Sequence, residues 1–256
     1  MRRIVVKVGS AILTQDGEIA IERMEALVNF LAEIKKSNEV ILVSSGAVSA
    51  GYTELKLDRN IISNKQALAS IGQPILMNKY AKKFASHNIL CSQVLVTAVN
   101  LNKDVDIQRI KNTVEILLSN NVIPIVNEND ATSTDELEVG DNDQLSAYIA
   151  KNLEADLLIL LSDIDAYYDK DPRTHTDAKV LKVVTEIAKE ELEKEVTPNN
   201  VFATGGIVTK LKAAQYLFDN NIDMFLSSGF DLSDVRSYML ENTHKGGTLF
   251  KAKNWK

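Results

Sequence analysis

The hydrophobic pattern of the chain alternates between short apolar runs and longer segments with apolar residues at helical spacing. Short apolar runs bounded by small or polar residues predict buried strands, and apolar residues three or four positions apart predict helices. Strands are predicted at 4–8, 40–43, 90–96, 122–126, 156–161, 222–226 and 248–250. Helices are predicted at 24–34, 61–71, 74–86, 107–119, 142–153, 186–195, 207–217 and 232–240. This alternation predicts a mostly parallel sheet covered by helices on both faces.

The same pattern indicates how the chain is divided. No internal repeat, low-complexity segment or flexible linker interrupts it. The character of the chain changes at Ser162, after which a short segment holds several aspartates and two tyrosines. We therefore expect a single domain with one continuous sheet and two lobes, an N-terminal lobe over about 1–161 and a C-terminal lobe over about 162–256.

Composition narrows the class of protein. The chain has 256 residues, of which 45% are hydrophobic, so it can bury a large core. Its net charge of −6 argues against a nucleic-acid surface. The single cysteine, Cys91, forms no internal disulfide and suggests a reducing compartment. The apolar runs are too short for a signal peptide or a membrane span, and the three histidines lack metal-ligand spacing. We expect a cytoplasmic protein with no membrane or nucleic-acid partner.

Acids and amides are concentrated directly after the predicted strand at 122–126. They begin at Asn127 and end at Asp143, where the next helix is predicted to begin. A solvated loop can carry such residues, and this interpretation stays open at this point. Ligands of α/β sheets, however, bind where a strand ends and a helix begins. The segment is therefore a candidate binding site.

Three loops rich in glycine or serine lie at or near strand ends. Lys7 to Ser10 places a cation beside a glycine, and Thr204 to Lys210 places two glycines before a helix that carries a lysine. Ser44 to Ala47 has similar small residues without a cation. Such loops are common as plain turns, but their backbone N–H groups also bind anions. Two lysine-bearing loops together with the acidic segment favour a polyphosphate with a divalent cation.

Several common phosphate-binding motifs are absent. The chain has no G-x-x-x-x-G-K-[ST] sequence and no G-x-G-x-x-G after its first strand, which argues against a P-loop enzyme and a dinucleotide fold. It also lacks the motif set of protein kinases. The motifs that it has are K-V-G-S from Lys7, S-S-G-A-V-S-A-G from Ser44, N-E-N-D from Asn127, V-G-D-N-D-Q-L-S-A from Val139, D-P-R from Asp171, T-G-G-I-V-T-K from Thr204 and G-T-L-F from Gly247.

In this order, and over essentially the whole chain, these motifs resemble those of the amino acid kinase family. The resemblance implies a three-layer α/β/α sandwich with a mostly parallel central sheet. It also implies ATP-dependent phosphorylation of a carboxylate. Within the family the motifs are most similar to those of members that phosphorylate the side chain of L-glutamate, the first step of proline biosynthesis. The amino acid would bind the N-terminal lobe and ATP the C-terminal lobe.

The resemblance assigns roles to individual residues. Lys7 and Lys210 would contact the transferring phosphoryl group from either side, and Asp143 would hold both lysines in place. Lysines usually lie on the surface, but Lys7 is inside an apolar strand, where an unpaired ammonium is costly. The residues expected to bind ATP are Lys7, Gly9, Ser10, Ser162, Asp163, Thr204, Gly205, Gly206, Ile207, Val208, Thr209 and Lys210.

L-Glutamate would bind between the serine loop and the acidic segment. Ser45 and the N–H groups after it suit a carboxylate, and the acids and amides suit the free ammonium. Mg²⁺ would be held mainly by the ATP phosphates, and we expect no protein ligand for it. The residues expected to bind glutamate are Ser45, Gly46, Ala47, Asp130, Asp141 and Asn142.

The resemblance also implies partners. We expect proline as a feedback inhibitor, a downstream glutamyl phosphate reductase that receives the product, and a homo-oligomer. The chain departs from the family pattern in two ways. Many members carry a further small C-terminal domain of RNA-binding type, which we do not expect here, and Ser162-Asp163 stands where the family often has Thr-Asp.

Two alternatives stay open. The first is another kinase of the same superfamily, acting on aspartate, N-acetylglutamate, carbamate or a nucleoside monophosphate such as UMP. The second is a non-catalytic amino-acid sensor that keeps the fold. A sensor has no need of both lysines and Asp143. A nucleotide substrate calls for basic residues near Ser45, and 47–55 contains none.

Overall fold

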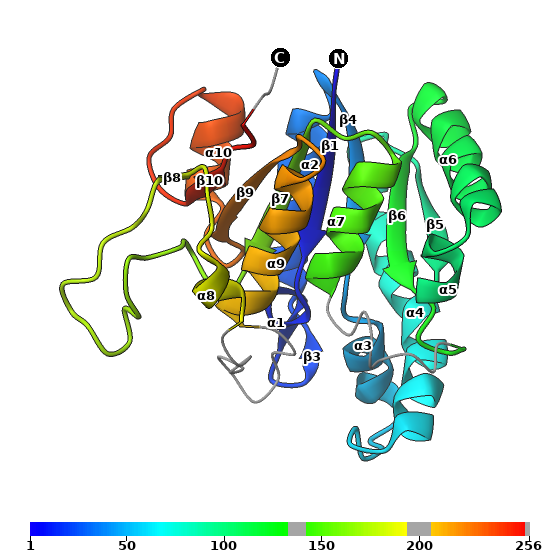
Figure 1. The fold of residues 1–256 in the computed structure, drawn as a ribbon. Helices are drawn as coiled ribbons and strands as arrows, with labels where there is room; N and C mark the ends of the chain where they lie inside the picture. The colour runs from blue at the N-terminus through cyan, green and yellow to red at the C-terminus, as the bar shows by residue number, and fades with distance from the viewer. Residues whose placement is uncertain (133–141, 194–205, 254–256) are drawn as a thin grey trace.

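The computed structural model describes residues 1–132, 142–193 and 206–253 of the chain (Figure 1). Its short hairpin consists of β2 (Thr14–Gln15) and β3 (Glu18–Ile19). The main sheet contains β1 (Arg2–Val8), β4 (Asn38–Ser44), β5 (Cys91–Val96), β6 (Ile123–Glu128), β7 (Leu157–Ser162), β8 (Val183–Val184), β9 (Asp223–Ser228) and β10 (Thr248–Phe250). These eight strands follow the order β5-β6-β4-β1-β7-β9-β10-β8, and only the β9–β10 pair is antiparallel.

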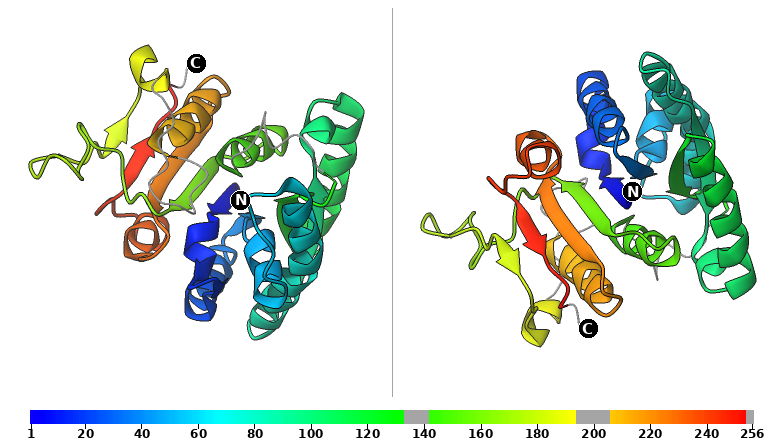
Figure 2. Two further views of the ribbon diagram at one scale, coloured as in Figure 1. Left: turned by 90° about the horizontal axis from the view of Figure 1, so that it is seen from below. Right: turned by 90° about the horizontal axis from the view of Figure 1, so that it is seen from above.

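Helices cover both faces of the main sheet, as the views along the strands show (Figure 2). The helices are α1 (Ser10–Leu13), α2 (Ile21–Ile34), α3 (Ala47–Glu54), α4 (Ile62–Ala85), α5 (Ala98–Leu101), α6 (Asp104–Ser119), α7 (Asn142–Asn152), α8 (Lys189–Leu192), α9 (Ile207–Phe218) and α10 (Ser233–Leu240). Helices α6, α7 and α9 share one hydrophobic core with the sheet, and α2, α4 and α10 share the other. The predicted α/β/α sandwich with a mostly parallel sheet is confirmed.

The alternation of side chains along β1 decides which residues face which layer. Val5 belongs to the core beneath α7 and α9, whereas Ile4 and Val6 belong to the core beneath α2 and α4. Because successive side chains of a strand point to opposite faces, Lys7 lies on the α7–α9 side. Six strands run parallel to one another and end at the lower edge in Figure 1, namely β1, β4, β5, β6, β7 and β9. Helices α1 and α3 and the first turns of α7 and α9 also lie there.

Helix α4 differs from the sequence prediction. Two helical segments were expected, at 61–71 and 74–86, but one helix runs through Pro74. Proline lacks the N–H that would bond to the carbonyl of Ser70 and usually interrupts a helix. Both Ser70 and Pro74 belong to the exposed residues of α4, so the Ser70 carbonyl can bond to water instead. The predicted helix at 186–195 is likewise only Lys189–Leu192 within the described residues.

Helix α3 was not predicted, because its run of small residues has no amphipathic pattern. Its packing explains why small residues are needed. A Cβ atom added to Gly72 of α4 would lie 1.8 Å from the Ala47 carbonyl oxygen and 2.3 Å from the Gly51 backbone nitrogen. A Cβ atom added to Gly51 would lie 1.9 Å from the Leu68 carbonyl oxygen. The backbones of α3 and α4 therefore touch at these two glycines.

Replacing Gly72 with alanine is expected to destabilise the protein by about 3 kcal/mol, the upper range for overpacking a core. The new methyl group meets backbone atoms on α3, so one helix has to move. Urea unfolding should show a lower midpoint with an unchanged slope. The control is Ser63→Ala at an exposed position of the same helix, where we expect less than about 0.5 kcal/mol. Equal stability of the two variants would contradict the contact.

No helix in the described part of the chain is both long and apolar enough to cross a membrane.

Candidate active site

A cluster of three charged side chains lies at the carboxyl edge of the sheet. Asp143 belongs to the first turn of α7, Lys7 to β1 and Lys210 to the first turn of α9. One oxygen of Asp143, Oδ1, accepts a hydrogen bond from Lys7 Nζ, and Oδ2 lies 3.0 Å from Lys210 Nζ. The three residues predicted to act in catalysis, which come from distant parts of the sequence, are therefore in direct contact.

All three charges of this cluster are withdrawn from water. Asp143 is fully buried, and only 5% of Lys7 and 3% of Lys210 is exposed. Burial by itself would raise the pKa of Asp143, but the Lys7 and Lys210 ammoniums outweigh it and hold that pKa well below its usual range. The carboxylate is therefore ionised at neutral pH. Two ammoniums around one carboxylate leave a net positive charge at the edge where anions would bind.

Neighbouring side chains hold the cluster in place; Thr209 was predicted to bind ATP, whereas Ser146 and Gln144 were not predicted to belong to the site. The Thr209 hydroxyl lies 3.2 Å from Asp143 Oδ2 and 2.9 Å from the Gly206 carbonyl oxygen. The Ser146 hydroxyl donates to the Asp143 carbonyl at 2.7 Å. The Gln144 side chain donates to the Thr209 carbonyl at 3.2 Å and so links α7 to α9. Contacts between two helices cannot be inferred from spacing within either one.

The loops after β1 and β4 meet beside the cluster. A Cβ atom on Gly9 would lie 3.7 Å from Lys7 Nζ, so the Gly9 backbone is next to the ammonium. The Ser45 N–H donates to the Val8 carbonyl at 3.3 Å, and Asn142 Nδ2 donates to Ser45 Oγ. The structure thus brings Ser45 and Asn142, both predicted to bind the substrate, together beside the Lys7 strand.

Backbone conformation shapes the two loops. Gly46 has φ +106°, which is unfavourable for other residues, and the chain turns there from β4 into α3 with Ala47 as its first residue. Ser10 is the first residue of α1. Both loops therefore place the N-terminus of a helix, whose first N–H groups have no partner within the helix, at the carboxyl edge.

The predicted nucleotide residues lie at the ends of β7 and the start of α9. Ser162 ends β7, next to β1 in the sheet, and its hydroxyl lies 2.9 Å from Asp163 Oδ1. Gly206 precedes α9, and Ile207, Val208 and Thr209 form its first turn before Lys210. Three further predicted residues, Asp141, Thr204 and Gly205, lie outside the described residues.

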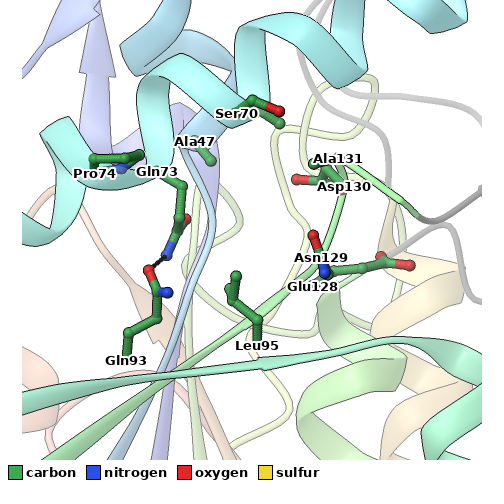
Figure 3. Close-up of a pocket in the computed structure, with 11 residues that line it drawn as sticks. Ala47, Ser70, Gln73, Pro74, Gln93, Leu95, Glu128, Asn129, Asp130 and Ala131 are labelled. Carbon is green, nitrogen blue, oxygen red and sulfur yellow. Dashed lines mark hydrogen bonds between the residues drawn. The ribbon is translucent and has the colours of Figure 1, made fainter.

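A cavity of about 280 Å³ adjoins these loops (Figure 3). Its lining includes Ala47 and Asp130, two of the residues predicted to bind the substrate. It also includes Gln73, Gln93 and Glu128, which were not predicted to bind the substrate. Gln93 lies inside an apolar strand pattern, and that placement alone marks it as unusual.

The arrangement suits the binding and transfer of an anionic group. It offers two ammoniums, the N-terminal turns of nearby helices and a buried carboxylate that contacts both ammoniums. Within the described ranges, no group of three His, Cys, Asp or Glu side chains could hold a metal ion. A divalent cation would here be bound through the oxygens of a polyphosphate, which Mg²⁺ commonly uses.

Comparison with known proteins identifies relatives over almost the whole chain. The profile of the Amino acid kinase family matches residues 2–227. A glutamate 5-kinase of Wolinella succinogenes is 53% identical over 255 residues, which cover 98% of each chain. A glutamate 5-kinase of Leishmania donovani is 52% identical over 250 residues, covering 98% of this chain and 95% of that one. Among solved structures, an isopentenyl phosphate kinase superposes with a TM-score of 0.68 at 15% identity, covering 97% of this chain and all of that one.

Proposed function

Because the chain belongs to the amino acid kinase family, we propose that it transfers the terminal phosphoryl group of ATP to the side-chain carboxylate of L-glutamate. The product is γ-glutamyl phosphate, and the reaction is the first step of proline biosynthesis. The observation that carries this proposal is the contact of Lys7 and Lys210 with the buried Asp143, in a chain about half identical to two glutamate 5-kinases.

The buried cluster accounts for catalysis without a general base. A carboxylate substrate is already ionised at neutral pH, so no proton has to be removed from it. Phosphoryl transfer then depends on positioning and on neutralising the negative charge of the transferring group. Lys7 and Lys210 supply that charge from two sides, and Asp143 orients both. The low pKa of Asp143 agrees with an orienting role rather than proton transfer.

The flanking loops bind the two substrates. The N–H groups of Ser10 and of the first turn of α9 donate to the phosphates of ATP, beside Gly9, whose own N–H donates to the Leu161 carbonyl oxygen at 3.3 Å. Ser162 with Asp163 borders the nucleotide. The phosphates of ATP would hold Mg²⁺, which would supply positive charge against the polyphosphate. On the glutamate side, the Ser45 loop receives a carboxylate, and Asp130, Asp141 and Asn142 receive the ammonium.

The alternatives have less support. A non-catalytic sensor would not require two buried lysines on one carboxylate, a costly arrangement that here lies at the carboxyl edge of the sheet. A nucleotide substrate would need cations beside Ser45, and α3, which follows that residue, carries none.

Hydroxylamine trapping tests the proposal directly. An acyl phosphate reacts with hydroxylamine to give a hydroxamate, whereas a phosphate ester does not. We expect hydroxamate from L-glutamate with ATP and Mg²⁺, and none from UMP. If no carboxylate substrate gives hydroxamate while ATP still binds, the sensor alternative is favoured.

Proline is expected to inhibit the enzyme by competing with glutamate. It keeps the α-carboxylate and the α-ammonium, so the groups that hold these parts of glutamate also suit proline. Initial rates at several proline and glutamate concentrations should give an apparent KM for glutamate that rises with proline while kcat is constant. Inhibition that does not depend on glutamate would place proline at another site.

Three further expectations stay predictions. The acyl phosphate product is reactive, which fits direct use by a glutamyl phosphate reductase. We also predict a homo-oligomer and a cytoplasmic location.

A further inference from the structure

Three side-chain amides form a hydrogen-bonded chain that ends at the cavity. Asn127, in β6, donates from Nδ2 to Gln73 Oε1 at 2.9 Å. Gln73, in α4, donates from Nε2 to Gln93 Oε1 at 2.8 Å. Asn127 and Gln73 are buried, with 2% and 8% exposed, whereas Gln93 in β5 is exposed at the cavity. These three amides thus connect a buried strand to a residue of the cavity wall.

The direction of these hydrogen bonds is fixed at the buried end. The two ends of a side-chain amide look alike in most structures and are assigned from their partners. Here the backbone N–H of Glu128 donates to Asn127 Oδ1 at 2.9 Å, and a backbone N–H can only donate. Asn127 must therefore present its NH₂ group to Gln73, and Gln73 must present its own to Gln93. The last amide, Gln93, then has its NH₂ group left over.

That NH₂ group faces the cavity. In Figure 3 the Gln93 nitrogen lies beside the oxygen that accepts from Gln73, on the side of Leu95. Among the residues that the structure describes, no atom accepts a hydrogen bond from Gln93 Nε2. The cavity therefore has a donor on one wall and the Asp130 side chain on another. An amino-acid head group, with one carboxylate and one ammonium, matches this arrangement.

We propose that Gln73 is a positioning residue that determines substrate specificity through the direction of this amide chain. It makes Gln93 offer an N–H donor to the α-carboxylate of the substrate while Asp130 receives the ammonium. The inference rests on the proposed function, since it assigns the cavity to the head group of glutamate. Its consequence is that reversing the direction of the amide hydrogen bonds should change which substrate head group is preferred.

Two isosteric substitutions reverse the chain from different positions. In Asn127→Asp the second carboxylate oxygen can only accept, so Gln73 turns its NH₂ group towards it and Gln93 turns in response. In Gln73→Glu the carboxylate accepts from both Asn127 and Gln93. In either variant Gln93 presents its oxygen to the cavity. Gln73→Met breaks the chain without adding a buried charge and leaves the orientation of Gln93 free.

The substrate pair that reports the direction is L-glutamate and its α-amide, isoglutamine. Both keep the γ-carboxylate and the ammonium, and only the α-group differs. The wild type should prefer glutamate. Both reversal variants should raise the KM for glutamate about 10- to 100-fold, the size expected for losing a hydrogen bond to a charged group, with little change in kcat. Isoglutamine should be unaffected or improved, because its NH₂ group can donate to the Gln93 oxygen.

The matched control is Gln108→Glu, an exposed amide-to-acid change on α6 whose hydrogen bond stays within that helix. It should leave the substrate ratio unchanged. Gln73→Met should bring the ratio of kcat/KM for glutamate to kcat/KM for isoglutamine towards one. Because it adds no buried charge, this variant also tests the proposal if the two acidic variants fail to fold. The proposal would be overturned if folded Gln73→Met, or both Asn127→Asp and Gln73→Glu, kept the wild-type ratio of kcat/KM for the two substrates.

A measurement on the free protein separates this inference from the proposed function. If the wild type forms no hydroxamate with glutamate, the proposed function fails, and turnover cannot report the direction of the amide chain. The side-chain NH₂ resonances of Gln93 can still report it. They should shift in Gln73→Glu, where this group becomes hydrogen-bonded to the new carboxylate, and not in Gln108→Glu. Unchanged Gln93 resonances in Gln73→Glu would refute the amide chain.

Discussion

Replacing Asp143 with asparagine is expected to lower kcat by at least about a hundredfold, the effect of losing one preorganised electrostatic group. Asp143 holds Lys7 through one oxygen and Lys210 through the other. Asparagine has nearly the same shape, but its NH₂ group would face one of the two ammoniums. That lysine would turn away and no longer neutralise the transferring phosphoryl group. The loss should appear in kcat more than in the KM for glutamate, because it affects the transition state.

The same substitution is expected to lower stability by about 3–5 kcal/mol, because it leaves buried ammoniums without their carboxylate. ATP should restore part of this loss, since its phosphates give both lysines a partner only in the folded state. Thermal unfolding with and without ATP therefore distinguishes a folded, inactive variant from an unfolded one. Asp219→Asn, the same change at an exposed position, is the control. Near-normal turnover in folded Asp143→Asn would remove Asp143 from the mechanism.

Most of the fold could be predicted because hydrophobic periodicity reports burial. Each of the six longer strands of the main sheet lies within about two residues of its prediction. Five of them, β1, β4, β6, β7 and β9, are mostly buried and therefore largely apolar. Helix α3 could not be predicted, because backbone contact at Gly51 and Gly72 stabilises it rather than an apolar stripe. The continuation of α4 through Pro74 depends on solvent exposure, which local sequence does not determine.

The candidate site, like the fold, has some residues that could be predicted from the sequence and others that could not. Lys7, Asp143 and Lys210 could be selected because each belongs to a motif, and the structure places them in contact. The roles assigned to them stay predictions. Gln73, Gln93 and Asn127 come together from α4, β5 and β6. No motif or spacing connects them, so only the packing of these elements reveals the amide chain.

L-Glutamate is expected to be a better substrate than N-acetylglutamate by about 10⁴-fold in kcat/KM. Asp130 lines the cavity and is proposed, together with Asp141, to receive the free ammonium. An acetamide carries no positive charge and adds bulk, so these carboxylates would lose their ionic partner on binding it. A site built around a polar group typically rejects an analogue without it by this factor.

Aspartate extends the same argument to the other end of the substrate. Its side chain is one methylene shorter, so with its head group held at Asp130 its carboxylate would fall short of the phosphoryl group between Lys7 and Lys210. A misplacement of about 1 Å can lower the rate a hundredfold, and we expect a loss of at least that size.

Hydroxamate assays with the three acids, at equal ATP and Mg²⁺, give the ratios directly. Asp130→Asn is the informative variant. It should lower kcat/KM for glutamate far more than kcat/KM for N-acetylglutamate, and so reduce the discrimination between the two substrates. A substitution that merely loosened the fold would lower both rates together. If N-acetylglutamate or aspartate reacts faster than glutamate in the wild type, the substrate assigned within the family is wrong. The proposed kinase reaction would survive that result, because Lys7 and Lys210 are proposed to bind the phosphoryl group and Asp130, a different residue, is proposed to select the amino acid.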